Sequence, residues 1–551
     1  MNETHPTLRA AAARFARSAR ALASRSDLGD DELTPELVEV LALLAEQAEW
    51  RVFVDGTRNF GHQAATVMLL RRLIDLSAFC GRVVLVYADY GRPDLGNTAA
   101  KLALMFPGID PSHMSDAVAS YGTCADIRFL PFARRSELLA PIAFGFTGGA
   151  DDMSVNYALQ LKVRFFARIQ PYLWDDPSSA KADVYYESSR IEQPQGAHLY
   201  LLDAFAEFQY LASRTLIAPA DWGWYADQQT FDQQLAHRSR NVRAVLSTPT
   251  RHWPIYGLQH FREHCAEMFL TCVLLALRVH GTLPGPVVLC SFSPLEDNED
   301  WCVLIDALAS DLRTGHSDLA ALRNAMLCHH AKGLAQGALA PGLLDAWLDT
   351  VSRWLMQHGR GVEVRVHRTY EAKSLRWIDC SQALEQALQA STSPSVHVVE
   401  LGSVPMDVFN HCLVQGQLPG IIEGQSAANL MTTLGKPFLQ LLRHEHVIKN
   451  GYARHLPGGR VLRGASEAAR VATLTRDVLP LRWFDPVSAP SPATYCSDLD
   501  CIANYLREAA DTATPVAGYF EEVGRHFSRN TQDKLLMALL AMRETMLAIS
   551  Y

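Results

Sequence analysis

Two polar loops of this sequence carry residues that could do acid–base chemistry or hold an anion. The first loop follows the apolar run Arg51–Asp55 and reads G-T-R-N-F-G-H-Q over positions 56–63. Asp55 ends the run and His62 lies in the loop, so a carboxylate and an imidazole stand a few residues apart. Either group can take a proton from an attacking oxygen or nitrogen. We therefore expect Asp55 or His62 to act as a general base.

The second loop, Glu423-Gly424-Gln425-Ser426, follows the short apolar run Ile421-Ile422 and precedes a helical stretch that begins at Ala427. Ser426 is a favourable N-cap residue. The first amides of a helix lack partners within the helix and lie at the positive end of its dipole. A strand, a glycine-containing loop and a helix N-terminus together predict an anion-binding site.

The segments around both loops alternate between strand and helix. Residues 51–55, 64–76 and 82–87 read as strand, helix and strand, which is a βαβ unit. Repeated units of this kind predict an α/β fold with two Rossmann-like parallel-sheet domains, and with helical extensions at both termini. The expected parts are a helical extension over 1–48, a first domain over 49–281, a second domain over 282–480, and a connector with closing helices over 481–551.

The second loop and its surroundings resemble the donor-binding motif of GT-B glycosyltransferases. In that family a glycine-containing loop, a Ser or Thr and a helix precede G-K-P and a strand. Here Ser426 lies nine residues before Gly435, which begins Gly435-Lys436-Pro437, and 438–442 reads as a strand. One departure concerns a Glu that many members place on this helix to hold ribose hydroxyls. Asn429 and Leu430 stand at the comparable positions.

The resemblance implies two domains that face a cleft and a metal-independent transfer from a nucleotide-sugar, with no further cofactor. The first loop is similar to the Gly-His loop of the acceptor domain, so Asn59, Gly61 and Gln63 become expected acceptor-side residues. Ser291 and Ser293 follow a strand over 286–290, where the family's second domain approaches the donor diphosphate. The expected donor-side set is Ser291, Ser293, Glu423, Gly424, Gln425, Ser426, Ala427 and Asn429.

Bulk composition excludes several other classes of protein. The formal net charge is −9 over 551 residues, which argues against a basic nucleic-acid-binding surface. The 11 cysteines are scattered without a C-x-x-C pair, as expected for reduced thiols in a cytoplasmic protein. No apolar run reaches the roughly 20 residues of a membrane span, so we expect no integral membrane contact. The Arg- and Ala-rich stretch 8–24 fits a solvated amphipathic helix or a targeting segment.

Several alternatives stay open from the sequence. A nucleotide-sugar 2-epimerase of the same architecture would need no separate acceptor, and a non-catalytic nucleotide-binding effector would need no base. The acceptor of a transferase could be a small molecule, a glycan or a protein. The acidic loop Gly148–Asp152 reads as a solvated turn rather than a metal-binding D-x-D motif. The aromatic-rich stretch 221–259 fits packing under loops or stacking on an acceptor.

Overall fold

The chain folds into two compact units in the computed structural model. Among the described residues, the first unit takes the chain up to position 199 and again from Arg525, and the second takes it from 233 to Gly524. The described residues are 34–56, 61–88, 97–106, 108–149, 156–169, 184–191, 196–199, 233–258, 264–280, 283, 285–293, 295–315, 317–332, 341–391, 394–402, 404–422, 427, 430–431, 434–440, 491–528 and 534–550.

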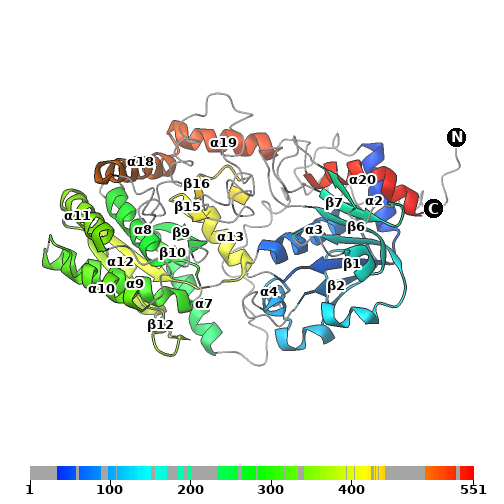
Figure 1. The fold of residues 1–551 in the computed structure, drawn as a ribbon, viewed down its shortest axis with the longest axis horizontal. Coiled ribbons are helices and arrows are strands. Elements are labelled where there is room, and N and C mark those ends of the chain that lie inside the picture. The colour runs from blue at the N-terminus through cyan, green and yellow to red at the C-terminus, as the bar shows by residue number, and fades with distance from the viewer. Residues whose placement is uncertain are drawn as a thin grey trace. The chain divides into compact units, whose positions relative to one another are not determined.

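The first unit is built on an eight-stranded mixed sheet in the order β3-β4-β2-β1-β5-β6-β7-β8 (Figure 1). Five neighbouring strands are parallel: β1 (Glu49–Val54), β2 (Arg82–Tyr87), β4 (Asp126–Pro131), β5 (Ile142–Thr147) and β6 (Val163–Ile169). Antiparallel strands extend both edges: β3 (Val118–Ala119), β7 (Val184–Ser188) and β8 (Ala197–Leu199). The sequence predicts strands over 51–55, 82–87, 125–130 and 141–146, because each is a short apolar run between turn signals, and these correspond to β1, β2, β4 and β5.

Helices of the first unit connect these strands and cover them. They are α2 (Pro35–Ala45), α3 (Gly61–Ser77), α4 (Thr98–Ala103) and α5 (Tyr157–Gln160), with 3₁₀ turns η3 (Pro111–Asp116) and η4 (Phe132–Glu137). The α3 helix joins β1 to β2 and buries most of its residues. The side chain of Thr34 caps α2 by accepting a hydrogen bond from the amide of Leu37 at 3.3 Å.

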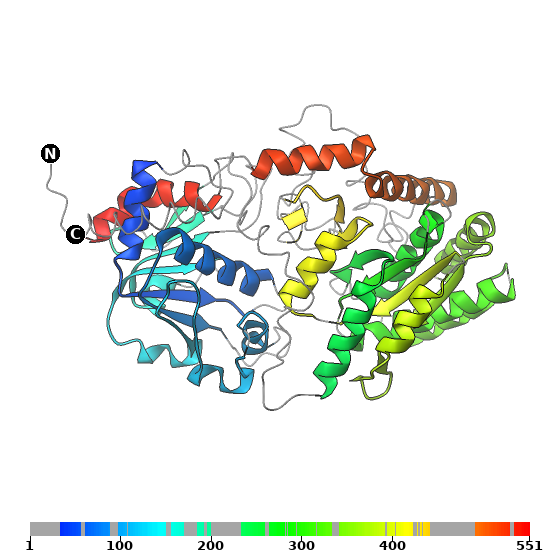
Figure 2. The same cartoon turned by 180° about the vertical axis from the view of Figure 1, so that it is seen from behind.

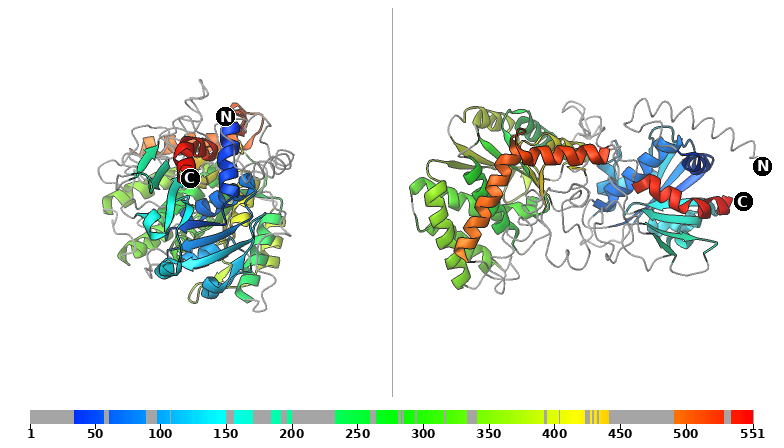
Figure 3. Two further views of the ribbon diagram at one scale, coloured as in Figure 1. Left: turned by 90° about the vertical axis from the view of Figure 1, so that its right-hand side faces the viewer. Right: turned by 90° about the horizontal axis from the view of Figure 1, so that it is seen from above.

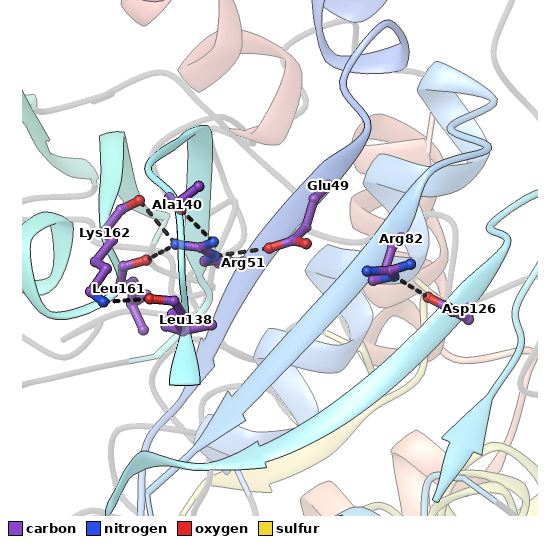
Figure 4. Close-up of polar contacts among 8 residues, drawn as sticks. All are labelled: Glu49, Arg51, Arg82, Asp126, Leu138, Ala140, Leu161 and Lys162. Atoms are coloured by element: carbon purple, nitrogen blue, oxygen red, sulfur yellow. Dashed lines mark hydrogen bonds and ion pairs between the residues drawn. The ribbon is translucent and has the colours of Figure 1, made fainter. Parts of the chain in front are cut away.

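A buried arginine ties β1 to the segments that precede β5 and β6, at the amino end of the sheet (Figure 4). Arg51 is 3 % exposed, and its guanidinium donates to the carbonyl oxygens of Leu161 (2.6 Å), Lys162 (3.0 Å) and Ala140 (2.7 Å). Its Nε also pairs with Glu49 at 2.9 Å. The guanidinium therefore supplies hydrogen-bond donors to three backbone carbonyl groups, which buried carbonyl groups need.

The second unit contains a six-stranded parallel sheet in the order β11-β14-β10-β9-β15-β16. Its strands are β9 (Arg251–Ile255), β10 (Val287–Ser291), β11 (Glu363–His367), β14 (Ser395–Glu400), β15 (Gly420–Ile422) and β16 (Phe438–Gln440). A small hairpin, β12 (Tyr370–Glu371) and β13 (Arg376–Trp377), follows β11. The sequence predicts strands over 286–290, 361–367, 396–401, 421–422 and 438–442, in agreement with the structure, whereas it does not predict β9 or the hairpin.

Helices pack on both faces of the second sheet (Figure 2). Val287 and Leu289 of β10 face the larger core, with α8 (Cys265–His280), α9 (Leu295–Thr314), α10 (Ala320–Ala331), α11 (Pro341–His358), α18 (Pro492–Ala510) and α19 (Pro515–Ser528). Val288 and Cys290 face the other core, with α7 (Gln233–Ser247), α12 (Ser381–Gln389) and α13 (Met406–Gln415). Because successive residues of β10 are buried on opposite faces, the strand is apolar up to Cys290.

The last helix returns to the first unit. α20 (Lys534–Ser550) packs against α2, as Figure 3 shows for the red and dark blue helices. Arg543 of α20 pairs with Glu39 of α2, and its Nε lies 2.9 Å from the carboxylate oxygen. Closing helices were expected within 481–551, and the structure shows that α20 joins the first unit.

The boundary that we placed at 281/282 is wrong, because β9 pairs along its whole length with β10 of the second sheet. The strand reads R-H-W-P-I, and a proline argues against a central strand because it has no amide hydrogen. Here β9 pairs with β15 only at Ile255, beyond Pro254. Trp253 is fully buried and donates to the carbonyl of Pro419 at 2.7 Å, so it belongs to the core of the second unit.

Candidate functional site

Asp55 directly follows β1, the strand at which the strand order of the first sheet reverses. From β1 the chain passes to β2 on one side, and later returns to β5 on the other side. In open α/β sheets, ligands bind beyond the carboxyl ends of the strands where the strand order reverses in this way. The described residues at this edge include Asp55 and Gly56, the start of α3, and the segment Thr147–Gly149 that ends β5.

Hydrogen bonds connect Gly56 and the first turn of α3 to Asp55, at the end of β1. The Asp55 carboxylate accepts from the Gly56 amide at 2.8 Å, and the Gln63 side chain donates to the Asp55 carbonyl at 2.7 Å. Gln63 is fully buried. Its amide group therefore links the first turn of α3 to the end of β1. Gly61 and His62 precede it at the first turn of α3, and Asn59 lies outside the described residues.

The end of β5 lies directly against the first turns of α3. The Thr66 hydroxyl accepts from the amide of Gly148 at 3.1 Å and lies 3.4 Å from the Thr147 hydroxyl. A Cβ on Gly148 would lie 2.7 Å from the backbone of Ala65, and one on Gly149 would lie 2.9 Å from the Cα of His62. Only glycine permits these approaches, so both glycines fix His62 beside the carboxyl end of β5.

The structure thus brings together Asp55, Gly61, His62 and Gln63 at one edge of the first sheet. Asp55 and His62 are both partly exposed, as a proton acceptor for a bound ligand must be. The sequence did not reveal the contribution of Thr66 or of Gly148 and Gly149. The glycine pair itself was visible, but its contact with α3 joins segments about 80 residues apart, such as Thr66 and Gly148.

The second sheet has a corresponding reversal at β9, between β10 and β15. The amide of Tyr256, just past β9, donates to the Ile421 carbonyl of β15 at 2.9 Å. The expected donor loop begins directly after Ile422, at the carboxyl end of β15. Glu423, Gly424, Gln425, Ser426 and Asn429 lie outside the described residues, and Ala427 is buried.

Ser291 is the last residue of β10, and Ser293 lies two residues beyond it. Both side chains are buried at the carboxyl edge of the second sheet. Ser291 is the register partner of Glu400, the last residue of β14, which sequence reasoning missed. Glu400 is fully buried, and burial raises the pKa of its carboxyl to about 7. The available signal was an acid at the end of β14, in the mostly apolar sequence V-H-V-V-E, since an unpaired charge is rarely buried.

Comparison with known proteins adds no family assignment. No protein-family model matches the sequence, and no curated protein matches it either. Within the described part of the chain, no helix is long and apolar enough to cross a membrane. The same residues form no cluster of His, Cys, Asp and Glu with the geometry of a metal site.

Proposed function

We propose that this protein is a glycosyltransferase of the GT-B type, which transfers a sugar from a nucleotide-sugar to an acceptor that is yet to be identified. The observation that carries the proposal is the placement of the two candidate loops. Each begins at the carboxyl end of a strand beside the reversal of strand order in its own Rossmann-like sheet. The return of α20 to the first unit also supports it, since the closing helices of GT-B proteins often cross back in this way.

The chemistry of such a transfer assigns a role to each unit. The leaving nucleoside diphosphate is an anion, and helix N-terminal amides with serine hydroxyls can stabilise the charge that develops on it. Ser291, Ser293 and the 423–427 loop would supply these groups. The acceptor must lose a proton, and Asp55 or His62 of the first unit would receive it. This mechanism requires the two units to face each other across a cleft.

Donor binding is the first test of the proposal. Purified protein is heated with UDP-glucose, UDP-N-acetylglucosamine, GDP-mannose and dTDP-rhamnose in separate samples, and the melting temperature is compared with that of the free protein. A ligand that binds only the folded state raises the melting temperature. At a ligand concentration of about 100 times Kd, the stabilisation is about 2.7 kcal/mol. The proposal fails if none of the four donors raises it.

Release of nucleoside diphosphate then distinguishes a transferase from the alternatives. With a deproteinised cell extract as the source of acceptors, we expect the wild-type protein to release diphosphate from the donor that binds. Asp55→Asn or His62→Ala should slow release by at least about 100-fold, the usual contribution of a general base. A 2-epimerase would instead change the sugar without release, and a non-catalytic protein would bind the donor unchanged.

A further inference from the structure

The carboxyl ends of β10 and β14 hold a buried polar cluster on the α8–α9 face of the second sheet. Ser291 and Glu400 are register partners on adjacent parallel strands, so their side chains lie on the same face. Asn298 and Trp301 of α9 are fully buried at this edge. The Asn298 side chain donates to the Ser293 carbonyl at 3.3 Å, which links α9 to the segment that follows β10.

Only one of the two carboxylate oxygens of Glu400 accepts hydrogen bonds in the described part of this cluster. Its Oε1 accepts from the indole of Trp301 at 2.7 Å and from the thiol of Cys302 at 3.5 Å. Its Oε2 has no hydrogen-bond partner in the described structure. The Ser291 hydroxyl favours the ionised carboxylate, but it makes no hydrogen bond of ordinary length to it. A buried carboxylate with one bare oxygen favours the protonated form.

Two neutral acids, Cys302 and Tyr370, and one cation, Arg368, act on Glu400. Burial raises the pKa of the Cys302 thiol and of the Tyr370 hydroxyl, so both remain neutral. Arg368 is the cation that acts on the cluster, and its Nη2 pairs with Asp306 at 3.2 Å. On α8, the buried Glu267 lies 3.2 Å from His330 of α10. Glu400 is therefore the group in contact with Ser291 whose charge can change during binding.

We propose that Glu400 is a proton-binding site coupled to donor binding, and that it takes up a proton when the diphosphate of a nucleotide-sugar binds beside Ser291 and Ser293. A nucleotide-sugar diphosphate carries two negative charges throughout the neutral range. A buried carboxylate next to it would repel it strongly, because charges interact more strongly in a low dielectric. Protonation removes the repulsion and leaves the Trp301 hydrogen bond in place. This inference rests on the proposed function, since it concerns the regulation of the same site.

The test is calorimetric titration of the full chain with the donor that gives the largest thermal shift, between pH 6 and pH 8.5. A nucleotide-sugar is the right probe because its phosphates do not titrate in this range, whereas a free diphosphate does. We expect wild-type affinity to be at least about fivefold weaker at pH 8.5, the lower end of typical coupling between sites. Titrations in two buffers with different heats of ionisation should show proton uptake on binding.

Glu400→Gln keeps the shape of the side chain and the hydrogen bond from Trp301, but it cannot take up a proton. We expect it to bind the donor with an affinity that no longer depends on pH. The matched control is Glu385→Gln on the exposed face of α12, which should behave as the wild type does. The inference is overturned if wild-type binding is independent of pH, or if Glu400→Gln keeps the wild-type dependence.

A second measurement uses the wild-type protein alone, in case the variant does not fold. Difference infrared spectroscopy at pH 7.5 should show growth of the carbonyl band of a protonated carboxyl when the donor binds. An unchanged band overturns the coupling and leaves the proposed function intact. If no nucleotide-sugar binds at any pH, the proposed function itself fails, and the coupling fails with it.

Discussion

Replacing Arg51 with methionine tests whether a buried charge holds the first unit together at the amino end of its sheet. Methionine keeps much of the apolar stem but cannot donate to the carbonyl groups of Ala140, Leu161 and Lys162 (Figure 4). An unsatisfied buried polar group costs about 1–3 kcal/mol. Water can reach part of the space that methionine leaves, so we take the lower value for each carbonyl. Removing a desolvated guanidinium offsets some of this loss, and leaving Glu49 without its partner adds to it. The expected destabilisation is about 3 kcal/mol.

Arg82→Met is the matched control for this experiment. Arg82 lies on the neighbouring strand, its side chain is 46 % exposed, and its Nε pairs with Asp126 at 3.2 Å. An exposed pair of this kind contributes up to about 1 kcal/mol. Amide hydrogen exchange of the full chain measures the opening of β1, β5 and β6 separately from the second unit. A loss of about 3 kcal/mol makes exchange about 150-fold faster, since RT is about 0.59 kcal/mol. Equal exchange in the Arg51 and Arg82 variants would refute the reasoning.

Three other predictions can be stated briefly. Gly149→Ala should push the first turn of α3 away from β5, which destabilises the first unit by about 1–3 kcal/mol and slows turnover. The control is Gly61→Ala, where the added methyl group has open space and the melting temperature should not change. His330→Leu should destabilise the second unit by about 1–3 kcal/mol, because it leaves the buried carboxylate of Glu267 without its nearest polar side chain, and adding Glu267→Gln should restore part of the loss in a double-mutant cycle. Burial raises the folded-state pKa of Glu400 from 4.5 to about 7, so its contribution to stability is fully present below pH 4.5 and falls as pH rises to 7. The loss is about 3 kcal/mol, and a Glu400→Gln protein that melts with the same pH dependence as the wild type would contradict it.

Local sequence patterns predict most strands of the two sheets, but they fail where a buried strand contains a charged residue or a proline. β10, β11, β14 and β15 are apolar or alternating runs, and their positions follow from periodicity. β9 contains Pro254, and β6 contains Arg168, which is 3 % exposed. Both residues indicate a surface segment by local rules. Their tolerance depends on pairing partners that are distant in the sequence.

The candidate site of the first unit shows the same division. The sequence places Asp55, Gly61, His62 and Gln63 near one another because they share one strand–loop–helix segment. The sequence does not indicate that Gln63 donates to the Asp55 carbonyl, or that Gly149 lies against His62. Whether a polar side chain meets a ligand or the backbone depends on what the fold packs around it.

What the sequence by itself determines is the alternation of strands and helices, because the spacing of apolar residues acts over only a few positions. The order of the strands in each sheet is decided by the tertiary structure alone, through hydrogen bonds between segments far apart in the chain. That order places Ser291 beside Glu400, Thr66 beside Gly148 and β9 in the second sheet. The tertiary structure also brings the last helix, α20, against α2. Local preference cannot specify such pairings, because each of them gains its stability only when both partners are already folded.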